Sequence, residues 1–158
     1  MKYSFRNYQA QDAQAIARVF RSAIVGVAAK DYEQEQIEAW LANAPSVAQF
    51  AAKYADGRLA LVAVDRVDEV VAFIDLESDG HIDMFYALPE AAGTDLTIRL
   101  YNLLEENARH LKLDCLYTEA SEAARSFFLR RGFVEKHRRD LTVGGVSIHN
   151  YAMEKALR

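Results

Sequence analysis

The sequence predicts an α+β fold in which a mixed, mostly antiparallel central sheet carries helices on both faces. Three observations support this class. Helical and strand-like segments alternate along the chain, apolar runs in the middle are joined by tight turns, and a long amphipathic segment separates the last of these runs from the next strand. With two prolines, seven glycines and no low-complexity tract in 158 residues, nothing marks a linker. We therefore expect one domain over residues 1–158.

The first third of the chain predicts one strand and two or three helices. Residues 3–8 alternate between apolar and polar side chains, which is typical of a strand. Asp12 has the position and the side chain of an N-cap for a helix over residues 13–24, where apolar residues recur at helical spacing. The same spacing over residues 33–42, and a weaker form of it over residues 47–54, indicates one or two further helices.

The middle of the chain predicts an antiparallel meander. Residues 59–64 and 70–76 are rich in β-branched and apolar side chains and are separated by a polar turn, as in a hairpin. Residues 78–80, with the sequence Ser-Asp-Gly, form a second turn signal because Asp and Gly tolerate the backbone angles of tight turns. This turn leads into a third strand over residues 81–88.

A long helix and a parallel strand should follow the meander. Leucines on one helical face predict a helix over residues 96–111, and residues 113–119 form the next apolar run. Strands joined by such a helix run parallel through a right-handed crossover. Residues 113–119 should therefore lie parallel to residues 81–88.

The end of the chain predicts a short helix and a closing hairpin. The helix covers residues 123–131 and ends at Gly132, where a left-handed C-cap is expected. Residues 133–143 and 146–155 then form two antiparallel strands, and the glycine pair between them supplies the turn.

Composition and charge exclude several classes of protein. The 19 basic and 23 acidic residues give a net charge of −4, which removes the general attraction to phosphates on which nucleic-acid binding depends, so we expect no nucleic-acid partner. A single cysteine, Cys115, allows no internal disulfide. The first residues carry no apolar signal core, and no run reaches the roughly 18 apolar residues of a membrane span. We expect a cytoplasmic protein without a membrane partner.

Three local segments carry a family likeness. Residues 81–89 form a strand that ends in a proline, and residues 117–121 with 125–133 place Phe-Phe-x-x-x-Gly-Phe after the parallel strand. Residues 150–155 form a matching last strand. These motifs, and the order of elements along nearly the whole chain, resemble the GCN5-related N-acetyltransferases (GNAT family). The resemblance implies transfer of an acetyl group from acetyl-coenzyme A to an amine, without a metal.

The resemblance also implies which residues bind the coenzyme. They lie on the strand over residues 81–88, on the turn before the long helix, and around the helix after the parallel strand: Phe85, Tyr86, Ala87, Ala92, Gly93, Thr94, Asp95, Leu96, Thr97, Ser121, Arg125 and Phe128. Arg130 and Arg131 could also meet phosphates, although a solvated basic face explains them more simply.

The turn that should hold the pyrophosphate departs from the family pattern. In the family this turn has the six-residue pattern Gln/Arg-x-x-Gly-x-Gly/Ala. In this chain Ala92 replaces the Gln or Arg, Asp95 replaces the first Gly, and Thr97 replaces the final Gly or Ala. A carboxylate beside the pyrophosphate repels it, and a Cβ restricts the backbone, so this turn predicts weakened coenzyme binding. In one alternative, Thr94 or Asp95 caps the helix and the turn only stabilises the fold. In another, Asp95 points away from the phosphate. The N–H groups then left for the phosphate are those of Gly93, Thr94, Leu96 and Thr97.

The expected proton donor to the leaving thiolate is missing. The resemblance places Phe128 where many family members have a tyrosine, and a phenyl ring cannot donate a proton. Tyr86, Tyr117 or Tyr151 could take its place, although core packing explains each of them as well. The thiol has a low pKa and can also leave without a protein acid.

Polar residues in strands that should be mostly apolar are candidates for the base and for acceptor binding. These residues are Asp75, Glu77, His81, Asp83 and Glu119. Asp83 and Glu119, which lie deepest in their strands, are the predicted general base. Asp75 and His81 are predicted to bind the acceptor together with the aromatic residues Tyr32 and Trp40, and the acidic candidates favour a cationic acceptor.

The turn length decides which of these side chains share a face. A three-residue turn over residues 78–80 places Glu77 opposite His81 and Asp75 opposite Asp83, whereas a two-residue turn shifts the pairing by one. His110 and His149 have no partner at a metal-ligand spacing, so we expect no metal site.

Two functions remain open from the sequence. The first is an acetyl-coenzyme A-dependent N-acetyltransferase in which a small amine or an amino-terminal substrate attacks the thioester directly. The second is a non-catalytic or ligand-sensing domain whose coenzyme site has decayed. The terminal hairpin could in either case pair two copies into a homodimer.

Overall fold

A computed structural model describes residues 2–158. The elements are β1 (Ser4–Asn7), the 3-10 turn η1 (Ala10–Asp12), α1 (Ala13–Gly26), the 3-10 turn η2 (Ala28–Lys30), α2 (Gln34–Ala42), α3 (Val47–Lys53), β2 (Leu59–Val64), β3 (Val70–Leu76), β4 (Phe85–Ala87), α4 (Asp95–His110), β5 (Cys115–Ala120), α5 (Glu122–Arg130), β6 (Val134–Val143) and β7 (Val146–Ala156). No helix in this part of the chain is long and apolar enough to cross a membrane.

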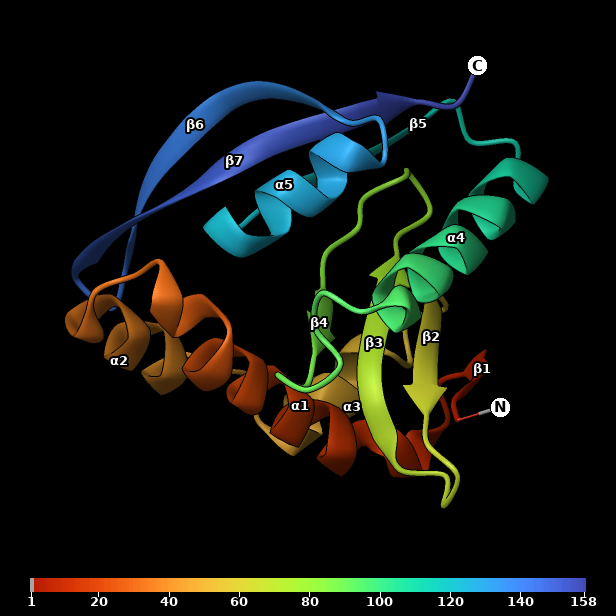
Figure 1. The fold of residues 1–158 in the computed structure, drawn as a ribbon, viewed down its shortest axis with the longest axis horizontal. Helices are drawn as coiled ribbons and strands as arrows, with labels where there is room; N and C mark the ends of the chain where they lie inside the picture. Colours follow the sequence, from red (N-terminus) through yellow and green to blue (C-terminus); the bar gives the residue numbers. More distant parts are fainter. Residues whose placement is uncertain (1) are drawn as a thin grey trace.

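The predicted α+β class, with helices on both faces, is confirmed (Figure 1). Side chains alternate across a strand, and two apolar cores follow from that alternation. Val62, Val64 and Phe73 pack in one core with α1, α2 and α3. Leu61 and Ile74 point to the opposite face and pack with α4 and α5.

The strands form two sheets rather than one continuous sheet. One has the order β1-β2-β3-β4 and the other β5-β7-β6, and every strand pair within them is antiparallel. The expected parallel contact consists of a single bridge between His81 and Tyr117. There, the N–H of Ile82 donates to the carbonyl of Tyr117 at 2.9 Å, and the N–H of Tyr117 donates to the carbonyl of Gly80 at 3.0 Å. The parallel direction is confirmed, but the expectation of a paired parallel strand is wrong beyond this bridge.

The predicted strand over residues 81–88 is also too long, because only Phe85–Ala87 form β4. The buried carboxylate of Asp75 explains the difference. Its Oδ1 accepts hydrogen bonds from the N–H groups of Asp83 and Met84 at 2.9 and 3.0 Å. The side chain thus replaces a strand partner where the regular ladder would have continued.

The turn over residues 78–80 has three residues, one of the two predicted lengths. The N–H of Glu77 donates to the carbonyl of His81 at 2.8 Å, so these residues face each other as that alternative expects. One position further, the N–H of Asp75 donates to Met84 rather than to Asp83, at 3.0 Å. Asp83 is therefore an extra residue that bulges from the strand.

Asp12 precedes α1 as predicted, but its side chain does not cap that helix. The carboxylate instead accepts the N–H of Gln9 at 2.7 Å and pairs with Arg6 at 2.8 and 3.0 Å. Arg6 comes from β1, so the sequence pattern around Asp12 suggested a cap without revealing this competing partner.

Candidate active site

A cavity lies where the two sheets diverge, and its wall combines β4 of the first sheet with Ser121 and α5, which follow β5 of the second sheet. Its wall includes Ala23, Val27, Ala28, Trp40, Phe85, Tyr86, Ala87, Ala92, Gly93, Thr94, Thr97, Ile98, Ser121, Ala123, Ala124, Ser126, Phe127 and Arg130. These residues come from the end of α1 and the start of η2, from α2, β4, the β4–α4 turn and the start of α4, and from α5 with Ser121 before it. The cavity thus connects the start of α4 to the gap between β4 and α5.

The start of α4 offers unpaired backbone donors. The N–H groups of Gly93, Asp95 and Leu96 make no hydrogen bond to any described residue. Gly93 has φ +74°, a conformation that favours glycine, and open space lies where a Cβ would stand. A helix N-terminus with free N–H groups attracts anions, so this turn fits a pyrophosphate.

The two threonines of this turn are already engaged. The N–H groups of Thr94 and Thr97 donate to the carbonyls of Ala91 and Thr94, at 3.3 and 3.2 Å. Of the four donors expected from the sequence, only Gly93 and Leu96 therefore remain free.

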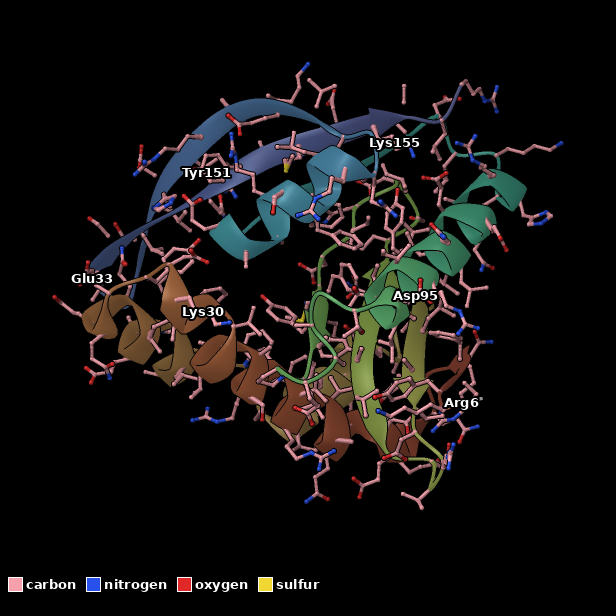
Figure 2. The ribbon with its side chains drawn as sticks, in the orientation of Figure 1. Arg6, Lys30, Glu33, Asp95, Tyr151 and Lys155 are labelled. Atoms are coloured by element: carbon pink, nitrogen blue, oxygen red, sulfur yellow. The ribbon has the colours of Figure 1, made fainter. Side chains whose placement is uncertain are left out.

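No side chain of this turn caps the N-terminus of α4. Thr94 is the N-cap residue of α4, but its hydroxyl donates to the carbonyl of Ala91 at 2.6 Å and caps nothing. Asp95 follows it as the first helical residue (Figure 2), and its side chain is exposed. The side-chain cap expected as one alternative is thus wrong, and Asp95 is not part of the cavity wall.

The edge of β4 that faces the gap carries free backbone groups. Leu88 and Met84 bond to β3, through the N–H of Leu88 and the carbonyl of Met84. Because antiparallel hydrogen bonding alternates along a strand, the N–H groups of Phe85 and Ala87 point to the other edge. No described strand pairs with that edge. Two donors therefore face the cavity side by side.

The predicted coenzyme residues divide into two groups. Those on the cavity wall are Phe85, Tyr86, Ala87, Ala92, Gly93, Thr94, Thr97 and Ser121. Leu96 and Phe128 are instead core residues, 4% and 2% exposed. Arg125 forms an ion pair with Glu135 and lies 4.8 Å from the centre of the Tyr151 ring. Arg130 lies on the wall, whereas Arg131 stacks over Phe127 at 5.7 Å.

The predicted acceptor and base residues separate in the same way. Trp40 lines the cavity, and Tyr32 packs edge-on against it with ring centres 5.6 Å apart. The remaining four do not line the cavity: Asp75, His81, Asp83 and Glu119. The structure brings these four together with Glu77 into a charged network beside α3.

Internal partners occupy this charged network. Asp83 pairs with Lys53 and, at 3.3 Å, with Arg58. The ring nitrogens of His81 lie 2.7 Å from Glu77 and 2.9 Å from Glu119. Burial opposes the charged form of the ring, but the hydrogen bonds to the two glutamates outweigh it and raise the pKa of His81. The network links the end of β3 to β5.

Asp75 is the buried member of this network. Burial raises the pKa of its carboxyl to about 6, against the lowering effect of hydrogen bonds from Met84 and Tyr54. The hydroxyl of Tyr54 donates to it at 2.8 Å, and Arg58 lies 3.6 Å away. These partners tie α3 and the loop after it to β3.

A second cluster beside the cavity was missed by sequence reasoning. Glu122 lies between the wall residues Ser121 and Ala123, and it accepts hydrogen bonds from His149 and, at 2.6 Å, from Tyr151. The hydrogen bond from Tyr151, helped by His149 and opposed by burial, lowers the pKa of Glu122. The spacing of His149 and Tyr151 on one strand places both on one face, a signal that could have pointed to the cluster.

Comparisons with known proteins place the chain in a family. The family model described as an acetyltransferase (GNAT) domain matches residues 28–155. A solved structure described as a GCN5-related N-acetyltransferase, aminotransferase class-II, from Rhodopseudomonas palustris is 35% identical, with a TM-score of 0.90 over 99% of this chain and 97% of that one. A search of curated protein sequences found no match.

Two more distant structures share the fold. The PaiA N-acetyltransferase from Thermoplasma acidophilum in complex with coenzyme A is 19% identical, with a TM-score of 0.80 over 99% of both chains. The putative acetyltransferase YncA from Salmonella typhimurium, with acetyl-coenzyme A, is 18% identical, with a TM-score of 0.73 over 100% of this chain and 95% of that one. With the match of the family model over most of its length, the chain belongs to the GNAT family of acetyltransferases.

Proposed function

We propose that this chain transfers the acetyl group of acetyl-coenzyme A to the nitrogen of a small amine or an amino-terminal substrate. The observation that carries the proposal is the cavity that runs from the free N–H groups at the start of α4 to the open edge of β4. An anionic, elongated thioester requires both features.

Different groups in and beside the cavity suit different parts of acetyl-coenzyme A. The N–H groups of Gly93, Asp95 and Leu96 suit the pyrophosphate, and the guanidinium of Arg130 adds a positive charge on the same wall. The N–H groups of Phe85 and Ala87 can donate to a carbonyl oxygen as negative charge develops on it. These donors are fixed by secondary structure, so they need no reorganisation during the reaction.

The reaction is a direct attack of the neutral amine on the thioester carbonyl carbon. A C–N bond forms, the C–S bond breaks, and the electron pair of that bond leaves on sulfur. No carboxylate or imidazole lies on the described cavity wall. The amine proton therefore passes to water, and the rate should rise with pH as more of the amine becomes neutral.

The proposal is tested by two measurements on the purified protein. Isothermal titration gives the dissociation constants of acetyl-coenzyme A and coenzyme A, which we expect to be micromolar. Release of the coenzyme thiol is then followed colorimetrically with a panel of amines. Amine-dependent thiol release supports acetyl transfer.

Two other results identify the rival function. Coenzyme binding without amine-dependent thiol release indicates a ligand-sensing domain. Absence of binding to the unmodified chain, with binding gained by Asp95→Gly, indicates a family fold whose coenzyme site has closed.

A further inference from the structure

We infer that the acceptor is an amine carried on an uncharged apolar group, preferably an aromatic one, which packs against Trp40 and the end of α1. This inference rests on the proposed function and names the substrate class for that same cavity.

The cavity wall divides between the two faces of the first sheet. Phe85, Ala92, Ala124 and Phe127 pack with the core of α4 and α5. Trp40 and Tyr86 pack with the opposite core of α1, α2 and α3, although they line the same cavity. The free N–H groups at the start of α4 assign the first wall to the coenzyme. The second wall is left for the acceptor.

The acceptor wall carries no ionised group. Its residues are Ala23, Val27, Ala28, Trp40 and Tyr86, all of them apolar or aromatic. The indole of Trp40 is held by the edge of Tyr32, and the hydroxyl of Tyr32 is itself fixed between the carbonyl of His149 at 3.0 Å and the N–H of Glu122 at 3.1 Å. The aromatic surface is thus rigid, which favours stacking of a flat apolar group.

The hydroxyl group of Tyr86, a residue of this wall, stays neutral. Its ring packs against Phe20 and Phe73, with centres 4.7 and 5.9 Å away. Its hydroxyl makes no hydrogen bond to a described residue. Burial, with smaller contributions from Asp83 and Asp75, raises the pKa of this hydroxyl. The oxygen is therefore free to accept a hydrogen bond from the amine nitrogen.

Two of the acidic groups close to the cavity are already paired. Glu122 is held by His149 and Tyr151, and Asp83 by Lys53 and Arg58. A second ammonium group on the acceptor would lose its hydration without gaining a free carboxylate, which is unfavourable. A carboxylate on the acceptor would find no free cation on this wall. The cationic acceptor expected from the sequence is thus not what this wall favours.

The test compares three primary amines, which differ in the charge and apolar character of the group they carry, in the thiol-release assay. Phenethylamine represents the aromatic class, cadaverine the cationic class, and β-alanine the anionic class. Burial of the aromatic group should make kcat/KM for phenethylamine about 10- to 100-fold higher than for cadaverine or β-alanine.

A matched pair of variants tests the location of the acceptor. Val27→Glu places a carboxylate on the acceptor wall, at the residue that follows α1, whereas Val25→Glu places it two residues earlier, in the last turn of α1, where the side chain is 57% exposed and outside the cavity. Val27→Glu should lower kcat/KM for phenethylamine at least tenfold and raise it for cadaverine. Val25→Glu should leave both values unchanged, and the dissociation constant of acetyl-coenzyme A should not change in either variant.

The outcomes separate this inference from the proposed function. Acetylation of cadaverine or β-alanine in preference to phenethylamine would overturn the inference while leaving the acetyltransferase in place. So would an equal response of both glutamate variants. If coenzyme binds but no amine is acetylated, the proposed function fails, and the inference fails with it. Trp40→Leu gives a second check, because it keeps the site apolar and should raise only the KM of the aromatic amine.

Discussion

At the scale of single residues, Asp95 contributes a negative charge at the start of α4, where we propose that the coenzyme phosphates bind. Its own N–H group is free, but its exposed carboxylate lies at the same helix terminus and repels an anion. We expect Asp95→Asn to tighten acetyl-coenzyme A binding by about threefold to tenfold. Isothermal titration at low and high salt measures this, and the gain should shrink at high salt because the charges lie in solvent.

The same change should cost stability. An acidic side chain in the first turn of a helix favours the helix by about 0.3–1 kcal/mol, and Asp95→Asn removes this contribution. Glu106→Gln, at an exposed position far along α4, is the matched control for loss of one negative charge. Equal tightening in both variants would show that net charge, and not the position of Asp95, controls coenzyme binding.

The hydroxyl of Tyr86 is a second residue-scale determinant. If it accepts a hydrogen bond from the amine, Tyr86→Phe should raise the KM of the amine about twofold to tenfold and leave acetyl-coenzyme A binding unchanged. Stability should not fall, since the hydroxyl has no protein partner. Tyr8→Phe removes another unpaired hydroxyl, one outside the cavity, and should leave the kinetics as they are. Loss of amine affinity in both variants would contradict the role of Tyr86.

At the scale of elements, Asp75 explains why β4 is short. Its carboxylate accepts hydrogen bonds from two N–H groups that a strand partner would otherwise bind. It also accepts a hydrogen bond from the hydroxyl of Tyr54, the C-cap residue of α3. The sequence predicted the turn over residues 78–80, because Asp and Gly signal it locally. It did not predict the bulge at Asp83, because the bulge depends on a buried side chain of the neighbouring strand.

The buried carboxyl of Asp75 should make stability depend on pH. Its pKa is about 6 in the folded chain, above its ordinary value near 3.9, so the folded state holds more protons between these pH values. The resulting stabilisation is present below about pH 4 and is lost as pH rises to about 6, a change of about 3 kcal/mol in the free energy of unfolding. Urea unfolding at a series of pH values measures it.

Asp75→Asn should remove this decline. The amide oxygen keeps an acceptor for the N–H groups of Asp83 and Met84 but carries no titrating proton. Asp31→Asn, at an exposed site, should leave the wild-type pH dependence in place. A decline of the same size in Asp75→Asn would assign the effect to other carboxyl groups.

At the scale of the whole molecule, the site results from the divergence of two sheets. The sequence indicated the wall formed by Phe85 to Ala87 and by the turn at Gly93, because the motifs there are local. It did not indicate Ala23, Val27 and Ala28, since helical periodicity identifies a buried face but not a cavity beside it. The polar residues His81 and Glu119 were expected at the site. Instead, the ring of His81 contacts Glu77 at the end of β3 and Glu119 in β5, and so links these two strands.

Because the cavity wall includes β4 of the first sheet and the α5 region that follows β5 of the second sheet, bound acetyl-coenzyme A should stabilise the molecule as one unit. We propose that the chain unfolds as a single domain, in which case ligand at 100 times its dissociation constant raises the free energy of unfolding by about 2.7 kcal/mol. Hydrogen exchange should then slow at Ala87 in β4 and also at Ala124 in α5, which lie on opposite sides of the gap.

Adenosine 3′,5′-diphosphate is the matched ligand for this measurement, since it lacks the pantetheine arm and the thioester. It should slow exchange at the start of α4 but not at Ala87. Protection of α4 and α5 alone by acetyl-coenzyme A would show that the thioester does not reach the edge of β4. In that case the N–H groups of Phe85 and Ala87 could not stabilise the reacting carbonyl, and coenzyme binding would be separated from catalysis.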